Sequence, residues 1–122
     1  MLRRDLVRLA WVFAFFVLFA IWAVAHAEVG YATWYEYGAY TTSGERFYPD
    51  GQTCAHPAFR AGMRLWYVRV TVLATGRSAQ CRVNDRGPAD WTHNKIDVSR
   101  GVARRLGILR AGRVKVRIDH LR

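Results

Sequence analysis

The sequence lacks most of the motifs that mark the larger classes of enzyme. It contains no phosphate-binding loop, no G-x-S-x-G element and no cysteine–histidine nucleophile pattern. It has two cysteines, Cys54 and Cys81, without a C-x-x-C pair, and no second histidine or cysteine stands at ligand spacing from His56. Acidic residues are also scarce, with 9 Asp and Glu against 19 Lys and Arg. We therefore expect no metal site, and the few carboxylates become the candidates for chemistry.

Residues 1–27 have the layout of a secretory signal peptide. Arg3, Arg4 and Arg8 precede an uncharged apolar run over residues 9–24, and residues 25–27 (A-H-A) offer small side chains where a signal peptidase reads them. The apolar run has 16 residues, fewer than the about 20 of a spanning helix. A retained membrane anchor is the alternative. We expect cleavage after Ala27 and a periplasmic or otherwise extracytoplasmic protein without a membrane association after cleavage.

The remaining chain, residues 28–122, is long enough for one small domain with a modest core. It carries 16 Lys and Arg and 8 Asp and Glu, a formal charge of +8. Such an excess favours an anionic partner. Export argues against nucleic acid, and an acidic wall polymer or an anionic membrane face fits the compartment better. The alternative is that the arginines only keep a small domain soluble.

Cys54 and Cys81 form an even pair in an exported chain of fewer than 100 residues, which predicts a disulfide. On the chain-entropy model, closing a loop of about 27 residues stabilises the domain by roughly 3 kcal/mol. Two buried thiols are the alternative.

The mature chain contains no internal repeat or low-complexity segment, and its pattern is mostly that of short β-strands. Residues 30–37 are aromatic and β-favouring, and residues 40–52 form a polar loop. Residues 63–73 alternate apolar and polar side chains, as in a half-buried strand. A turn at 75–77 leads into a return strand at 77–84, which predicts a hairpin.

The last third of the chain predicts one short helix between two strands. Residues 96–98 form a short apolar step, and Ser99 is suited to cap a helix that Gly107 closes in a left-handed conformation. Residues 113–118 alternate apolar and basic side chains, which predicts a final strand with one basic face. Five or six short strands with one small helix favour a closed small barrel, because closure removes exposed sheet edges.

Three acids are candidates for catalysis by their context. Glu45 lies in the polar loop, Asp85 ends a strand, and Asp97 stands between two apolar residues just before the helix cap. A regular strand would turn Asp85 to the buried face. An acid that is partly protonated near neutral pH can donate a proton to a leaving oxygen, and glycosidic cleavage commonly uses two carboxyl groups. Each acid also has a structural alternative, as an exposed loop acid, a turn former or a buried hydrogen-bonding group.

The histidines and aromatic residues of the mature chain are ambiguous from the sequence alone. A single His56 is more often structural than catalytic, and we expect His93 and His120 to be exposed to solvent. The aromatic group near the start of the domain offers either a stacking face for sugar rings or core packing. It comprises Tyr31, Trp34, Tyr35 and Tyr37.

Five segments together resemble the RlpA-like (rare lipoprotein A-like) family of double-psi β-barrels. Residues 30–35 (G-Y-A-T-W-Y) resemble the family's opening segment, and residues 42–47 (T-S-G-E-R-F) resemble its acidic loop. Residues 53–56 (T-C-A-H) resemble the segment that follows this loop in the family. Residues 82–88 (R-V-N-D-R-G-P) are the most specific segment, and residues 96–99 (I-D-V-S) resemble its helix start. The resemblance covers nearly all of the mature chain, in order.

This resemblance implies a mostly-β fold, a six-stranded double-psi β-barrel with one or two short helices over residues 28–122. Some family members carry a glycan-binding SPOR module, which we do not expect here because the sequence stops at Arg122. The family includes lytic transglycosylases that cut peptidoglycan glycan strands between N-acetylmuramic acid and N-acetylglucosamine and leave 1,6-anhydro ends. No cofactor is implied, peptidoglycan is the expected partner, and we expect a monomer.

Residue roles are carried over from the family by matching positions. The resemblance favours Glu45 and Asp85 as catalytic acids, with Asp97 as a third candidate because related barrels use an acid there. His56, Asn84 and Arg86 would position the glycan, and Trp34 and Tyr35 would contribute to substrate binding.

A non-catalytic, expansin-like module that binds or loosens the cell wall is the alternative function. Glu45 favours the enzyme, because such a binder needs no acid in that loop. A third possibility is a basic domain that holds an anionic polymer through arginine alone. Its binding would weaken sharply with salt.

Overall fold

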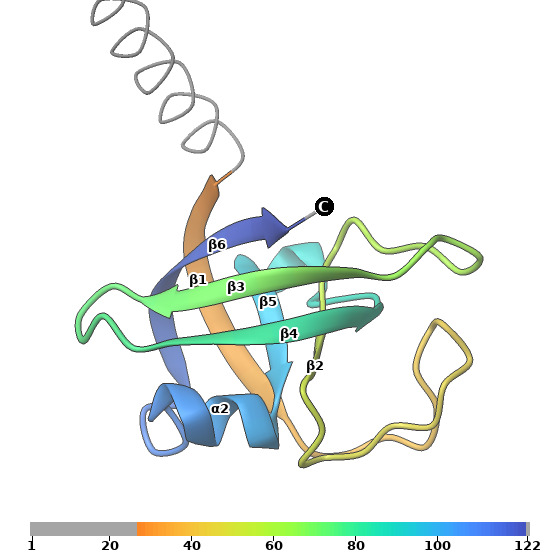
Figure 1. Ribbon diagram of the computed structural model, residues 1–122, viewed down its shortest axis with the longest axis horizontal. Helices are drawn as coiled ribbons and strands as arrows, with labels where there is room; N and C mark the ends of the chain where they lie inside the picture. The colour runs from red at the N-terminus through yellow and green to blue at the C-terminus, as the bar shows by residue number, and fades with distance from the viewer. Residues whose placement is uncertain (1–26, 122) are drawn as a thin grey trace, which may run out of the picture.

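The computed structural model describes residues 27–121, which form a closed barrel with one short α-helix (Figure 1). The strands have three to nine residues. In chain order the elements are β1 (Ala27–Tyr35), β2 (Thr53–Ala55), β3 (Trp66–Val72), β4 (Ser78–Asp85), the 3₁₀ turn η1 (Asp90–Thr92), β5 (Asn94–Ser99), α2 (Arg100–Leu106) and β6 (Arg113–Leu121).

The barrel closes in the strand order β1-β5-β2-β4-β3-β6. The pairs β1–β5 and β2–β4 are parallel, and the other pairs are antiparallel. Strands β3 and β4 form the expected hairpin and lie side by side in Figure 1. This arrangement confirms the predicted six-stranded barrel and is consistent with a double-psi fold.

The barrel interior is filled by the apolar side chains of alternate strand positions. On β3, Trp66, Val68 and Val70 are buried, while Tyr67 and Arg69 between them are exposed. The predicted disulfide is also present, because Cys54 on β2 and Cys81 on β4 are bonded, and both are fully buried. The covalent link therefore joins two neighbouring strands within the buried core.

Helix α2 begins and ends where the sequence predicts. The hydroxyl of Ser99 accepts a hydrogen bond from the backbone N–H of Val102, and Gly107 closes the helix with φ 72°. Ser99 Oγ also donates to the carbonyl of Gly51, which ties the helix start to the polar loop before β2. The cap thus fixes the end of β5, the strand that carries Asp97.

Two features of the fold were not predicted. The strand β2 has only three residues, too few for a visible alternation. On β4, the pairing with β2 skips from Val83 to Asp85, so Asn84 is an extra residue in the register. Asn84 is therefore buried next to the buried Val83. Because the strand is not regular here, the condition under which Asp85 would face the interior is not met, and its side chain is only partly buried.

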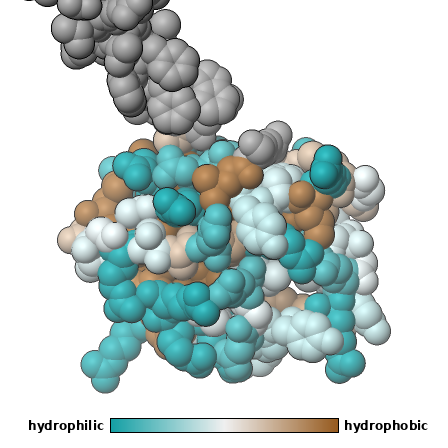
Figure 2. All heavy atoms as spheres, in the orientation of Figure 1, coloured by the Kyte–Doolittle hydropathy of each residue, from teal (hydrophilic) through white to brown (hydrophobic). Residues whose placement is uncertain are grey.

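The predicted export signal lies outside the described residues, except for Ala27 at the start of β1. Within residues 27–121, no helix has the length and apolar character to cross a membrane. Hydrophilic residues cover most of the face drawn in Figure 2, as the high content of arginine leads one to expect.

Candidate active site

Two of the three candidate acids lie in one row across the barrel. Ala55, the last residue of β2, pairs with Asp85 on β4 and with Asp97 on β5. Adjacent strands are about 4.8 Å apart, so the Cα atoms of the two acids are separated by roughly 10 Å. The topology therefore brings together two acids that are far apart in the sequence, with a small side chain between them.

Asp97 is a partly buried acid of this row. Burial raises the pKa of Asp97 to about 6, the nearby negative charge of Asp85 adds to the rise, and a hydrogen bond from Thr33 opposes it. Thr33 Oγ1 donates to Asp97 Oδ1 over 3.1 Å, and Thr33 is the β1 residue paired with Asp97. A carboxyl group with this pKa is partly protonated near neutral pH and can serve as a proton donor.

Asp85 is surrounded by hydrogen-bond donors. Its Oδ1 accepts from the backbone N–H of Thr42 (2.9 Å), the hydroxyl of Thr42 (2.7 Å) and the backbone N–H of Arg86 (2.9 Å). Its Oδ2 accepts from the hydroxyl of Tyr35 at 3.3 Å. These donors suit an ionised carboxylate, which can only accept hydrogen bonds.

Tyr35 is held beside both acids by packing. Its ring stacks on Phe47 with centroids 4.7 Å apart. Burial raises the pKa of Tyr35 well above its ordinary value, and the charges of Asp85 and Asp97 raise it further. The phenol therefore keeps its proton and acts as a hydrogen-bond donor to Asp85.

Glu45 lies apart from this row, in a bidentate ion pair with Arg82. Its two carboxylate oxygens accept from Arg82 over 2.7 and 2.9 Å. The hydrogen bonds and charge of Arg82 hold the pKa of Glu45 below its usual value, although partial burial opposes them. Glu45 is thus ionised at neutral pH, which suits it poorly to the role of proton donor.

The polar loop that carries Glu45 is anchored to the end of β4. The N–H of Ser43 donates to the carbonyl of Asn84, and the N–H of Thr41 donates to the carbonyl of Glu45. Gly44 has φ 91°, a conformation that favours glycine, which explains its place in this tight loop. The loop therefore holds Thr42 against Asp85 and Glu45 against Arg82.

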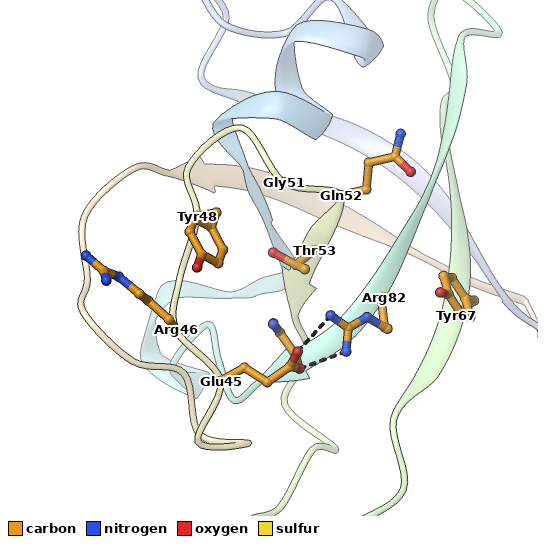
Figure 3. Close-up of a pocket in the computed structure, with 9 residues that line it drawn as sticks. Glu45, Arg46, Tyr48, Gly51, Gln52, Thr53, Tyr67 and Arg82 are labelled. Carbon is orange, nitrogen blue, oxygen red and sulfur yellow. Dashed lines mark hydrogen bonds and ion pairs between the residues drawn. The ribbon is translucent and has the colours of Figure 1, made fainter.

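A hollow of about 490 Å³ lies beside Glu45. Figure 3 shows the Glu45–Arg82 pair between the side chains of Tyr48 and Tyr67, which are both exposed. Asn84 also lines this hollow. A second hollow, near Asp85, includes Thr42, the exposed Arg86 and Pro88 in its lining. Asn84 and Arg86, which were both predicted to contact substrate, directly precede and follow Asp85 in the sequence. Asn84 lines the first hollow and Arg86 lines the second.

Trp34 and His56 do not line these two hollows. Trp34 is half-buried and packs against the core. His56 is only 6% exposed, and its Nε2 lies 2.9 Å from Glu28 Oε2. The geometry favours structural roles for both side chains.

A cluster of Glu28, His56 and His120 joins β1, β6 and the segment after β2. His120 Nε2 lies 2.6 Å from Glu28 Oε2, so the prediction of an exposed His120 is wrong. The reason is that its ring packs against Trp66 and turns inward at the end of β6.

These three side chains could in principle hold a metal ion, since their ligand atoms lie within 4.8 Å of one another. The hydrogen bonds argue against this. Nδ1 of His56 accepts from the backbone N–H of Ala58, and Nδ1 of His120 accepts from Trp66 Nε1–H. In a neutral ring the proton must then sit on Nε2 and point to Glu28, whereas a metal-binding Nε2 needs its lone pair.

Arg82, Tyr48 and Tyr67 also line the hollow beside Glu45 and were not predicted from the sequence. Tyr67 belongs to the exposed set of the alternating β3 pattern, which was visible in the sequence. The pairing of Arg82 with Glu45 spans 37 residues and carries no local signal.

Comparison with known proteins shows the family of this chain. A family model described as lytic transglycolase matches residues 27–118. The chain belongs to the lytic transglycolase family. Its barrel also resembles that of the Streptomyces papain inhibitor, with a TM-score of 0.65 and 23% identity over 79% of this chain and 94% of that one. That likeness concerns the fold alone.

Several relatives of this lytic transglycolase barrel bear the name endolytic peptidoglycan transglycosylase RlpA. The protein of Pseudomonas aeruginosa is 38% identical over 80% of this chain and 28% of its own length. The proteins of Neisseria meningitidis and Yersinia pestis are 37% and 44% identical, over 77% and 69% of this chain. The chain spans 39% and 22% of their lengths, so it matches only one part of each relative.

Proposed function

We propose that this chain is a peptidoglycan lytic transglycosylase that acts outside the cytoplasm, as a monomer and without a cofactor. The observation that carries the proposal is the pair of acids on either side of Ala55, which differ in environment. The pKa of Asp97 is raised to about 6, while Asp85 is surrounded by four donors. Two carboxyl groups in contrasting environments suit one proton donor and one ionised partner.

In the proposed reaction, Asp97 donates its proton to the glycosidic oxygen between N-acetylmuramic acid and N-acetylglucosamine. The bond between that oxygen and C1 of the muramic acid breaks, and positive charge develops at C1. The carboxylate of Asp85 stabilises this charge electrostatically. The 6-hydroxyl of the same sugar then attacks C1, its proton passes to the Asp97 carboxylate, and a 1,6-anhydro end forms while the acid is regenerated.

This assignment differs from the expectation that Glu45 and Asp85 carry the chemistry. Glu45 is in a bidentate ion pair that keeps it ionised, so we assign it a binding role. Asp97 takes the role of the acid because its carboxyl group is the one whose surroundings favour the protonated form.

The test is to incubate the purified chain with peptidoglycan, with and without stem peptides, and to look for 1,6-anhydromuramyl ends by mass spectrometry. Asp97→Asn and Asp85→Asn should each abolish most of the product, by about a hundredfold or more for loss of the acid. Glu45→Gln should retain the chemistry with weaker binding. Full activity of Asp97→Asn would contradict the assignment, and glycan binding without any product would favour the expansin-like alternative.

A further inference from the structure

An exposed arginine and an exposed tyrosine are stacked on the barrel surface where the neighbouring strands β1 and β6 pair (Figure 1). The guanidinium carbon of Arg113 on β6 lies 3.7 Å from the centre of the Tyr31 ring on β1. The Nε–H of Arg113 donates to the side-chain oxygen of Asn94 on β5 over 2.7 Å. The stack and the hydrogen bond hold the plane of this guanidinium, so it loses less side-chain entropy when it binds a ligand.

Most of the hydrogen-bonding capacity of Arg113 is unused. Neither Nη group has a hydrogen-bond acceptor in the described part of the chain, and the guanidinium forms no ion pair there. Lys115 is the next exposed residue of β6 and the register partner of Tyr31, and it too has no ion pair among the described residues. Arg117 differs, because it is bound to Asp119 over 3.1 Å. Two uncompensated positive charges therefore border the Tyr31 ring.

Arg113 belongs to the same row across the barrel as the two acids. It pairs with Thr33 on β1, and Thr33 pairs with Asp97 on β5. Directly paired residues point to the same face of a sheet, and the hydrogen bond from Thr33 to Asp97 agrees with this. At about 4.8 Å per strand, the Cα atoms of Arg113 and Asp97 are roughly 10 Å apart. A group bound at Arg113 is therefore close enough to belong to the same substrate molecule as a bond held at Asp97.

We propose that Arg113, Lys115 and Tyr31 form a binding site for a carboxylate of the substrate, and this inference rests on the proposed function. The two free Nη groups of Arg113 match a carboxylate with two parallel hydrogen bonds. The ammonium group of Lys115 adds a second positive charge. The muramic acid residues of peptidoglycan bear carboxylates, either directly on the lactyl group or on the stem peptide joined to it. The site therefore recognises the substituent of a muramic acid ring.

Such a site selects the bond that is cut. The two sugars of a peptidoglycan strand alternate, and only muramic acid carries the lactyl group. A strand that is shifted by one ring brings no carboxylate to Arg113 when an N-acetylglucosamine ring takes the place of muramic acid. Arg113 is thus a specificity-determining residue, which favours the register that places C1 of muramic acid at Asp97.

An NMR titration of the purified chain with short soluble ligands tests the site. The probes are the disaccharide of N-acetylglucosamine and N-acetylmuramic acid with a free lactyl carboxylate, the same disaccharide with a stem tetrapeptide, and the uncharged chitobiose. We expect at least one carboxylate probe to shift the Nε–H signal of Arg113, and chitobiose to leave it in place. A shift with the first probe alone identifies the lactyl carboxylate as the ligand, and a shift with the second alone identifies a peptide carboxylate. If both probes shift the signal, the site accepts either carboxylate.

Substitutions of Arg113 measure its contribution to the affinity. Arg113→Gln should raise the dissociation constant of the carboxylate probe about threefold to tenfold, because it removes both the charge and the paired donors. Arg113→Lys should restore only part of the affinity, since an ammonium group cannot form two parallel hydrogen bonds. Arg69→Gln is the matched control, because Arg69 is an exposed strand arginine that pairs with Asp119, at the other end of β6.

Two results would overturn the carboxylate site. One is that neither carboxylate probe shifts the Arg113 signal. The other is that Arg113→Gln and Arg69→Gln weaken binding equally, since this would reduce the effect to the net charge of the protein.

The two proposals can fail separately. In the reaction itself, Arg113→Gln should act on KM for peptidoglycan more than on kcat. Carboxylate binding that depends on Arg113, without anhydro product from peptidoglycan, would support the site and remove the lyase. Anhydro product without carboxylate binding, and with KM unchanged in Arg113→Gln, would support the lyase and remove the site.

Discussion

The hydroxyl of Tyr35 lies 3.3 Å from Oδ2 of Asp85 and donates a hydrogen bond to it. The stacking of Tyr35 on Phe47 fixes the donor, and Thr42 and Arg86 hold the other oxygen of the same carboxylate. Because packing fixes Tyr35 and the backbone hydrogen bonds of its loop fix Thr42, the orientation of Asp85 is set before substrate binds. Such preorganisation is what an electrostatic role in catalysis requires.

Tyr35→Phe should therefore slow the reaction while keeping the fold. The ring and its stacking remain, but Asp85 loses one donor, which corresponds to about 1.5–3 kcal/mol for a hydrogen bond to a charged group. We expect kcat to fall about tenfold with little change in KM, measured as anhydro ends released from peptidoglycan. Tyr37→Phe is the control, since Tyr37 is 84% exposed. A fall in thermal stability large enough to explain the loss of activity would argue for a purely structural role.

The rate should depend on pH through Asp97. A proton donor with a pKa of about 6 is active in its protonated form, so kcat should fall as pH rises through that value. In Thr33→Val the hydrogen bond that lowers the pKa of Asp97 is absent, so the descending limb should move to higher pH. The pH–rate profiles of the two proteins check this. A limb that stays in place would show that another group controls the rate.

The outline of the barrel could be predicted from the sequence, because strand alternation and helix caps are local signals. The pattern of residues 63–73 predicted β3, and Ser99 and Gly107 predicted both ends of α2. The strand β2 and the extra residue Asn84 left no such signal, since three residues cannot show a period and a bulge depends on its partner strand.

The same distinction applies to the candidate site. Asp85 and Asp97 were identified as candidates by their context, but their relation through Ala55 follows only from the barrel register. The roles of the acids also could not be derived from the sequence, because the burial of Asp97 and the ion pair of Glu45 with Arg82 arise from contacts between distant segments. His120 turned inward for a comparable reason, since Trp66 and Glu28 lie on other strands.

Asp97→Asn should stabilise the folded protein at neutral pH. The pKa of Asp97 is about 6 in the fold against an ordinary value of 3.8, so ionising it in place costs up to about 3 kcal/mol. With a folded pKa above the unfolded one, the stability of the parent is fully present below about pH 4 and declines as pH rises to about 6. The amide avoids this decline. Urea unfolding at pH 4 and pH 8 should show a gain for Asp97→Asn only at the higher pH, and equal stabilities at pH 8 would contradict the raised pKa.

Glu28→Gln should have the opposite pH dependence. Burial tends to raise the pKa of Glu28, but the hydrogen bonds and charges of His120 and His56 outweigh it and hold the pKa below its ordinary value of 4.5. A folded pKa below the unfolded one means that the contribution to stability is present above about pH 4.5 and is lost as pH falls through the lower, folded value.

In the parent protein, one charged oxygen of the Glu28 carboxylate accepts hydrogen bonds from the Nε2–H groups of both imidazoles. The amide oxygen of a glutamine at this position is uncharged. The stronger, charge-assisted bonds are lost, which should lower the free energy of unfolding by about 1–3 kcal/mol at pH 7 and by much less near pH 3. Urea unfolding at the two pH values measures the difference. Added zinc should not restore the stability of the variant or raise that of the parent, because both Nδ1 atoms accept hydrogen bonds and keep the proton of each neutral ring on Nε2. A zinc-dependent rise in the parent alone would show instead that the three side chains form a metal site.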